Sequence, residues 1–215
     1  MPFNSDFNDK QIQILQVAEN LFAEKGFDGT SIRTIAKEAK INIAMVSYYF
    51  GSKERLLESL VIFRTKDLKI QIDNLLTINL EPIDKINKLI EIYIHKINCN
   101  KGIYRILHFE KATKKEEINI NAFYELRKSN FKTLETIIKE GQEKGVFRKD
   151  ISIPLLTPTI LGTFFHFHMN KDYFSDLLNL NSEELFNNYI KTNLTKHIQQ
   201  TIKALLVYDV SATEM

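Results

Sequence analysis

The stretch TSIRTIAKEAKINIAMVSYYFGSK, from Thr30 to Lys53, decides the fold predicted for this chain. Apolar or small residues recur in its first half three or four positions apart, and so share one helical face: Ile32, Ile35, Ala36 and Ala39. Thr30, Asn42 and Ser52 each precede a helical run and carry a side-chain oxygen that can cap it. The pattern predicts a helix-turn-helix, the unit that places one helix in the DNA major groove.

The charge pattern of this stretch also favours DNA as the partner. No acidic side chain lies between Glu38 and Glu54, whereas Lys40 and Lys53 are both present. A surface that meets phosphates should be free of carboxylates, because neutralising phosphates drives most of the affinity. Asn and Ser on the second short helix can bond base edges or phosphates, Ala and Met can contact thymine methyl groups, and Tyr hydroxyls can donate to phosphates.

The longer segment LFAEKGFDGTSIRTIAKEAKINIAMVSYYFGSKERLL, from Leu21 to Leu57, resembles the TetR family of bacterial transcriptional regulators. The turn FAEKGF, the TSI before the second helix, the pair IA, the closing YYF and then SKE occur in the family's order. The resemblance implies that Thr30, Tyr48 and Lys53 hold phosphates and that residues 42–47 read bases. Together with the residues selected by the charge and hydrogen-bonding capacity of their side chains, these form the predicted DNA-contacting set. It consists of Thr30, Arg33, Lys40, Asn42, Ile43, Ala44, Met45, Ser47, Tyr48, Tyr49 and Lys53.

Some of these positions have a second interpretation. Tyr49, followed by Phe50, fits a core position, and Arg33 could pair with a nearby glutamate instead of a phosphate. Lys40 departs from the family, which usually has glycine in this turn. A left-handed turn would cost a residue other than glycine on the order of 1 kcal/mol. The sequence therefore predicts a strained turn if Lys40 adopts the left-handed conformation.

Composition narrows the class of protein. The chain has 215 residues, a formal net charge of +2 and a pI near 8.4, so a nucleic-acid argument has to rest on local charge. Its one cysteine, Cys99, excludes an intramolecular disulfide and a cysteine zinc cluster. The polar start MPFNSDFNDK is unlike a signal peptide, and no run approaches the ~18 apolar residues of a membrane span. We therefore expect a cytoplasmic protein.

Helical periodicity extends through nearly the whole chain and predicts an all-α fold of nine helices without a sheet. We expect a DNA-binding domain at residues 8–66, a ligand-binding and dimerisation domain at 67–208, and flexible termini at 1–7 and 209–215. Two short helices are expected to begin at the caps Thr30 and Asn42. The other expected helices are Asp9 to Gly26, Ser52 to Leu80, Pro82 to Ile97, Ile103 to Thr113, Ile120 to Gly141 or Gly145, Pro154 to Asn170, and Ser182 to Val207.

The last two long helices, Pro154 to Asn170 and Ser182 to Val207, are the predicted dimer interface. A single helix-turn-helix contacts too little DNA for strong specificity, so two copies commonly read two half-sites. Across a two-fold axis, these two helices would form a four-helix bundle. The alternative is that Phe164, Phe165 and Phe167 only fill the core of one chain. The family resemblance favours the dimer.

The middle helices combine aromatic side chains with a few polar tips, a composition typical of small-molecule pockets. The residues predicted to bind an effector are Tyr93, Tyr104, His108, Phe123, Tyr124, Phe131, Phe164 and His168, although the same spacing also suits plain core. An effector must bind the conformation with low DNA affinity more tightly than the DNA-bound one. The helix from Ser52 would carry that change, since it begins at the DNA and runs toward the effector domain.

The histidines and the single cysteine allow a second class of function. His95 and Cys99 have the spacing of paired metal ligands on a helix, and His108, His166, His168 and His197 lie elsewhere, which leaves a metal-responsive regulator as the alternative. His166 and His168 diverge by about 200° on a helix, so no third ligand is evident. No phosphate-binding glycine loop, nucleophile elbow or paired-carboxylate motif predicts catalysis or a cofactor. We therefore expect a dimeric repressor that binds a palindromic operator and is released by a small molecule.

Overall fold

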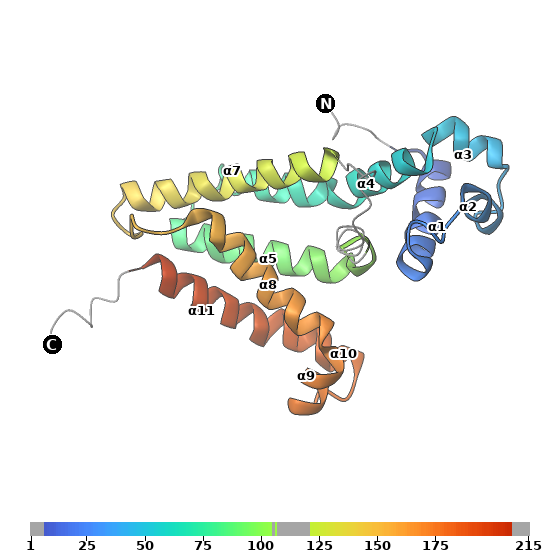
Figure 1. Cartoon of the computed structure of the whole chain (residues 1–215). Helices are drawn as coiled ribbons and strands as arrows, with labels where there is room; N and C mark the ends of the chain where they lie inside the picture. Colours follow the sequence, from blue (N-terminus) through green and yellow to red (C-terminus); the bar gives the residue numbers. More distant parts are fainter. Residues whose placement is uncertain (1–6, 105, 107–120, 208–215) are drawn as a thin grey trace. The chain divides into compact units, whose positions relative to one another are not determined.

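The computed structural model describes residues 7–104, 106 and 121–207, and in those ranges the chain forms helices and turns without a strand (Figure 1). This confirms the predicted all-α class. The chain divides into two compact units, one from Met1–Lys69 with Cys99–Lys128 and the other from Ile70–Asn98 with Ser129–Met215. Each unit thus combines two separated stretches, whereas the predicted domains follow chain order. No described helix is both long enough and apolar enough to cross a membrane.

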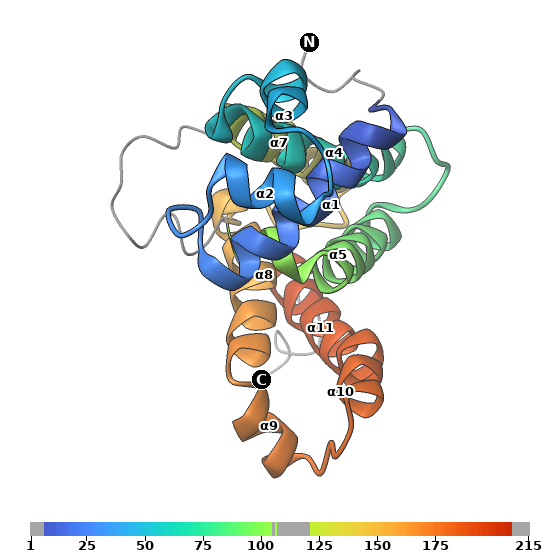
Figure 2. The ribbon, with the colours of Figure 1, turned by 90° about the vertical axis from the view of Figure 1, so that its right-hand side faces the viewer.

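The first unit contains α1 (Asp9–Lys25), α2 (Ile32–Glu38), α3 (Ile43–Phe50) and the first part of α4 (Lys53–Asn74), as Figure 2 shows. Asn8 starts α1 with a capping box, in which its side chain accepts from the Gln11 amide and the Gln11 side chain accepts from the Asn8 amide. Gly26 ends α1 with a positive φ of 73°. The predicted first helix is confirmed at both ends.

The core of the first unit is built from the faces that sequence spacing predicts. Ile35, Ala36 and Ala39 of the α2 region are buried, and Val46 and Phe50 anchor α3 one turn apart. They pack within one core with apolar residues of the other helices, namely Ile14, Leu15, Ala18, Leu21, Phe22, Leu56, Leu57 and Leu60. Each Å² of apolar area that is buried contributes a free energy of ~25 cal/mol to stability. The burial of these side chains therefore holds α1, α2 and α3 together.

One ion pair crosses the first unit between α1 and α4. The Arg64 guanidinium donates twice to Glu19 Oε2, from Nε at 2.8 Å and from an Nη at 2.5 Å. Glu19 is 8% exposed, and a Cβ at Gly102 would lie 3.3 Å from its other carboxylate oxygen. The backbone of Gly102 therefore helps to exclude water from the pair, which strengthens it.

The second unit contains most of α5 (Pro82–Cys99) and of α7 (Asn121–Glu143), followed by α8 (Ile153–Met169), α9 (Lys171–Leu177), α10 (Glu183–Tyr189), the π-helical turn η1 (Ile190–Leu194) and α11 (Thr195–Leu206). Pro82 begins α5 as expected. Ser182 caps α10 by accepting from the Leu185 amide, also as expected. The buried stripe of α5 is Ile86, Leu89, Ile90, Tyr93, Ile94 and Ile97.

The helix from Ser52 ends at Asn74 and not near Leu80 as expected. The amides of Leu75, Leu76 and Thr77 each bond the carbonyl three residues earlier, so the helix tightens into turns well before Pro82. The Thr77 hydroxyl also donates to Asn74 O at 2.9 Å and competes with continuation of the helix.

The segment before Ser182 forms α9, a helix that the sequence did not predict. Asn179 adopts a left-handed conformation with φ 54°, and the bonds from Asn179 N to Asp176 O and from Leu180 N to Ser175 O close a Schellman motif. Asparagine tolerates this conformation better than most residues, so Asn179 was an available stop signal. The predicted helix from Ile103 to Thr113 lies mostly outside the described residues. Within this range, residues 103, 104 and 106 are described, and all three are helical.

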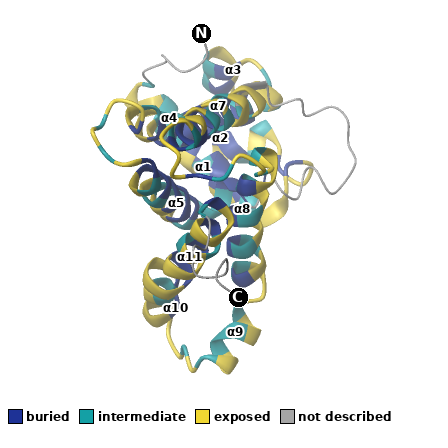
Figure 3. Ribbon diagram, turned by 90° about the vertical axis from the view of Figure 1, so that its left-hand side faces the viewer, coloured by how far each residue is buried: buried dark blue, intermediate teal, exposed yellow. Residues whose placement is uncertain are grey.

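The α8 helix is buried on one side and exposed on another in the single chain. Leu156, Ile160, Phe164 and Phe167 are buried, but Leu155 is 61% exposed and Met169 is 77% exposed. Figure 3 shows exposed residues along α8 and α11 as well as on α9. The face of α8 that carries Leu155 and Met169 is therefore not covered by the described residues of the chain.

A buried lysine joins α5 to α7 in the second unit. Lys85 is 6% exposed, and its Nζ lies 2.8 Å from Glu140 Oε2. The hydrogen bond from Lys85 is the main reason that the pKa of Glu140 lies below its ordinary value of 4.5, and Lys144 adds to the shift. A lowered carboxyl pKa stabilises the fold at neutral pH, and this contribution is lost as the pH falls through the lowered value.

The variant Glu140→Gln tests this pair. At pH 7 it should lose about 1–3 kcal/mol of unfolding free energy, because it leaves the Lys85 ammonium buried without a charged partner. Its stability should also fall less than that of the parent between pH 5 and pH 3. Urea denaturation at several pH values measures both effects. Glu135→Gln, which removes an exposed pair with Lys139 on the same helix, should change stability by only a few tenths of a kcal/mol.

Candidate nucleic-acid interface

The α3 helix presents one face to solvent and buries the other. Val46 and Phe50 hold it in the core, while Tyr48 is 84% exposed and Ile43 is 45% exposed. Ala44 and Ser47 are also exposed, and Met45 and Tyr49 are half-buried. The exposed positions fall at i, i+1, i+4 and i+5, which is one side of a helix. A duplex laid against this face would meet side chains that suit base edges and phosphates.

Asn42 starts α3 and limits what its own side chain can offer. Its Oδ1 accepts from the Ala44 amide at 2.8 Å, which confirms Asn42 as the predicted N-cap. The carboxamide NH₂ group is then the part of this side chain that remains for a base or a phosphate. The first amides of α3 also carry the positive end of the helix dipole, which favours an anion.

The turn between α2 and α3 is a Schellman motif centred on Lys40. Lys40 has φ 53°, and the bonds from Lys40 N to Lys37 O and from Ile41 N to Ala36 O are 3.1 and 3.0 Å long. The left-handed conformation that glycine would adopt without strain is thus imposed on a lysine. The Lys40 side chain is exposed beside α3. The strained residue therefore also adds a positive charge to the candidate DNA-binding surface.

Thr30 does not lie where the sequence placed it. Ser31 is the N-cap of α2, and its hydroxyl accepts from the Thr34 amide at 3.0 Å. Thr30 is 1% exposed, and its hydroxyl bonds the carbonyls of Leu21 and Gly26. Its side chain therefore fixes the turn after α1, and the predictions that it caps α2 and binds phosphate are not supported. Ser52, by contrast, is confirmed as a cap, since its hydroxyl accepts from the Arg55 amide.

Lys53 connects the start of α4 to the loop between α1 and α2. Its Nζ donates to the carbonyls of Phe27 and Thr30, both at 3.0 Å, and lies 4.2 Å from the centre of the Phe27 ring. Two of its three ammonium protons are therefore used within the chain. The third proton and the positive charge remain for a phosphate, so any DNA role comes in addition to a structural one.

Two exposed arginines, Arg33 and Arg55, belong to the same candidate DNA-binding surface, and the sequence predicted only Arg33. Arg33 is exposed and forms no ion pair with another described residue. Arg55 is exposed on the first turn of α4 beside Gly51 and was overlooked, although it directly follows the SKE motif. Glu54 interrupts this basic group. A hydrogen bond from the Ser52 side chain is the main cause that lowers the pKa of Glu54.

The predicted effector residues fall into different environments. Phe164 is fully buried and stacks on His168, with ring centres 5.8 Å apart and an interplanar angle of 5°. Tyr93 and Tyr104 are buried, and Tyr124 is 59% exposed, which suits a pocket wall least. Phe123 and Phe131 are half-buried, and His108 lies outside the described residues.

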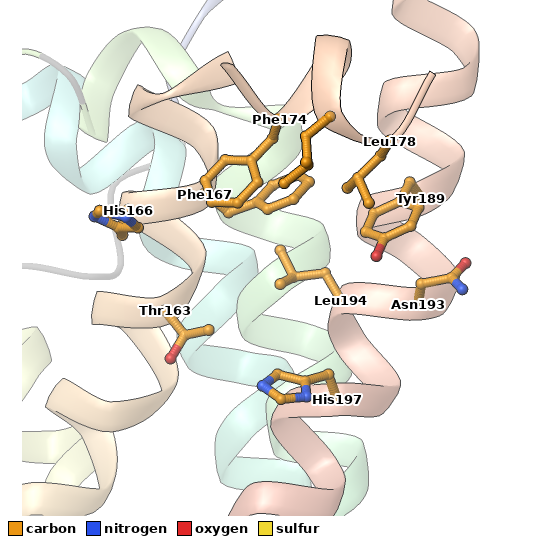
Figure 4. Close-up of a pocket in the computed structure, with 10 residues that line it drawn as sticks. Thr163, His166, Phe167, Phe174, Leu178, Tyr189, Asn193, Leu194 and His197 are labelled. Carbon is orange, nitrogen blue, oxygen red and sulfur yellow. The ribbon is translucent and has the colours of Figure 1, made fainter. Parts of the chain in front are cut away.

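A cavity of about 600 Å³ lies in the second unit among α8, α9, α10, η1 and α11 (Figure 4). It contains none of the predicted effector residues. Its lining consists of Thr163, His166, Phe167, Phe174, Leu177, Leu178, Tyr189, Asn193, Leu194 and His197. Sequence spacing could not find it, because α9 and the π-helical turn that shape it were not predicted.

The histidine and cysteine pattern does not form a metal site in the described chain. His95 and Cys99 are both exposed on α5. No three His, Cys, Asp or Glu side chains among the described residues are grouped so that they could hold one ion. The metal-responsive alternative therefore gains no support from the geometry.

Two family models match separate segments of the chain. The family model described as "Bacterial regulatory proteins, tetR family" matches residues 14–60, and "Tetracyclin repressor-like, C-terminal domain" matches residues 82–205. The chain is 28% identical over 179 residues to the HTH-type transcriptional repressor NicS of Pseudomonas putida, covering 77% of this chain and 78% of NicS.

Solved structures show a similar fold. The hemolysin II transcriptional regulator HlyIIR is 30% identical, with a TM-score of 0.58 over 89% of this chain and 96% of that one. The fatty acid degradation regulator FadR from Bacillus halodurans is 19% identical, with a TM-score of 0.71 over 93% of this chain and 97% of that one.

Replacing Lys40 separates backbone strain from charge at the interface. Lys40→Gly should raise the unfolding free energy by about 1 kcal/mol, because glycine adopts the left-handed conformation without strain. Lys40→Ala keeps the strain and should give no such gain, while both variants lose the same cation. Thermal unfolding measures the difference. Equal stability of the two variants would show that the turn is not strained.

Proposed function

Because the chain belongs to the TetR family of bacterial transcriptional regulators, we propose that it is a repressor that binds an inverted-repeat operator as a homodimer and is released by a small molecule. Members of this family are DNA-binding regulators and not enzymes, and the relative NicS is named as a repressor. The observation that carries the proposal is the α3 helix, which is anchored by Val46 and Phe50 and exposes a carboxylate-free face.

The proposed division of labour on DNA follows from exposure and chemistry. Ile43, Ala44 and Ser47 lie on the exposed face of α3 and would contact base edges in the major groove. Tyr48, at the exposed end of the same helix, would donate to a phosphate oxygen, with Arg33, Lys40 and Arg55 supplying positive charge around it. Thr30 has no place in this set, and Lys53 contributes mainly by fixing the loop.

The uncovered face of α8 supports the proposed homodimer. Leu155, Gly162, His166 and Met169 lie at helical spacing, and all four are exposed. A Cβ placed on Gly162 would meet no atom within 4 Å, so a helix of a second chain could approach closely there. Leu205 on α11, 45% exposed, extends the apolar surface. Paired across a two-fold axis, α8 and α11 of two chains would form a four-helix bundle.

Release by an effector is proposed from the family and from the course of α4. This helix begins at Lys53, next to α1, α2 and α3, the three helices that would read DNA and are called the reading head below. It continues as one helix from the first compact unit into the second. A ligand that prefers one position of α4 would bias the spacing of the two reading heads in a dimer. Structural neighbours named as KstR2, a ketosteroid transcriptional regulator, and FadR, a fatty acid degradation regulator, favour a largely apolar effector.

Selection from a random double-stranded DNA library tests the proposed repressor and its symmetry. The parent protein should recover an inverted repeat whose half-sites lie about one helical turn apart. Leu155→Glu should weaken the dimer in sedimentation and bind the full repeat more weakly, because it places charge in the proposed bundle. Val146→Glu, at a loop position of 45% exposure, is the matched control and should remain dimeric. Recovery of no repeat would contradict the proposal.

Two variants on α3 separate sequence reading from backbone binding. Tyr48→Phe removes one phosphate donor and should weaken binding about 3- to 10-fold on every sequence, without loss of stability at this exposed position. Ser47→Ala should instead change the preferred base at one position of each half-site. Affinities for the selected operator and for singly substituted versions measure both effects. A uniform loss with Ser47→Ala would remove this residue from base reading.

A further inference from the structure

We propose that the cavity among α8, α9, α10, η1 and α11 is a binding site for a small amphipathic organic anion. It is distinct from the aromatic set that the sequence suggests for the effector. The apolar body of the ligand would lie against Phe167 and Leu194, and its anionic head would lie near His197 (Figure 4). A volume of about 600 Å³ falls within the usual range of small-molecule sites.

The inner part of the cavity is an ordered aromatic surface. Phe167 is 5% exposed and Leu194 is 6% exposed, so these two side chains form the floor. Phe167 stacks on Phe174 at 4.6 Å and 26° and on Tyr189 at 5.5 Å and 10°. With Leu178 beside them, these rings give an apolar body both flat and aliphatic contacts.

The mouth of the cavity offers hydrogen-bond donors and no acid. None of the ten lining residues carries a carboxylate, while His166, Asn193 and His197 are exposed polar groups on the lining. The Thr192 hydroxyl lies 2.8 Å from Asn193 Oδ1, so the Asn193 NH₂ group remains for a ligand. A neutral imidazole donates from one nitrogen and a protonated one from both. A carboxylate or sulfonate head fits this set better than a cation.

The π-helical turn η1 gives the cavity its shape on the α10 to α11 side. The Thr195 amide and the Thr195 hydroxyl, the latter at 2.8 Å, both bond the Ile190 carbonyl, which holds the wider turn in place. The extra residue brings both Asn193 and Leu194 to the lining, between Tyr189 and His197. Turns of this kind are rare within helices and are frequent at functional sites. The turn is thus a second feature, independent of the volume, that indicates a ligand.

An occupant would contact α8, α9 and α11 at once and hold these helices in one arrangement. Because α8 and α11 also form the proposed dimer interface, occupancy would be coupled to the spacing of the reading heads. This regulatory consequence rests on the proposed function, whereas binding itself does not. The test therefore measures binding without DNA.

Fluorescence of 8-anilinonaphthalene-1-sulfonate, an aromatic anion, tests the site on the full-length protein. Leu178→Trp fills the cavity and should remove one binding equivalent per chain, while Leu185→Trp, at an exposed position outside the lining, should keep it. Decanoate should displace the bound probe at least about tenfold better than decanol, because a charged head gains charge-assisted hydrogen bonds. His197→Leu should reduce that preference for decanoate without changing the fold.

The outcomes separate the parts of the proposal. Equal probe binding by Leu178→Trp and the parent would overturn the location of the site, and equal displacement by decanoate and decanol would overturn the anionic head. Absence of probe and decanoate binding at millimolar concentration would overturn the site altogether. If Leu178→Trp does not fold, as judged by circular dichroism, the decanoate preference of His197→Leu decides the question. None of these results depends on whether an operator is found.

Discussion

The contact between Lys53 and the loop after α1 is the constraint on which the reading head depends. One ammonium bonds the carbonyls of Phe27 and Thr30 at 3.0 Å and lies over the Phe27 ring. It fixes the first residue of α4 to the loop that leads into α2, so the start of α4 and this loop are held together within the first unit. A charged group is well suited to this role, because it can satisfy two carbonyls and still face an aromatic ring.

The interface shows how local strain and capping serve the exposed face of α3. Asn42 uses its carboxamide oxygen to start the helix, and Lys40 accepts a left-handed conformation that lets the chain turn directly into it. Both residues are therefore partly committed to the backbone, whereas the side chains of Ile43, Ser47 and Tyr48 are exposed on α3. Thr30 is the extreme case, since its hydroxyl is wholly used in the turn after α1.

The second unit leaves apolar surface uncovered and adds irregular backbone. The face of α8 with Leu155 and Met169 is exposed in the single chain, and the proposed homodimer would cover it. The left-handed Asn179 and the π-helical turn held by Thr195 shape the neighbouring cavity. These features cost conformational energy locally. Nearby, the rings of Phe167 and Phe186 stack on each other.

The sequence by itself determined the all-α class, most helix starts and the buried faces around Ile35, Val46 and Phe50, because caps and three-to-four spacing are properties of a few adjacent residues. It also predicted which short helix would face DNA. Only the tertiary structure decided that Thr30 is a turn residue, that Lys53 is occupied by carbonyls 23 and 26 residues away, and that α9 and η1 enclose a cavity. Such features depend on which distant groups come within bonding distance, and no local pattern in one sequence encodes that.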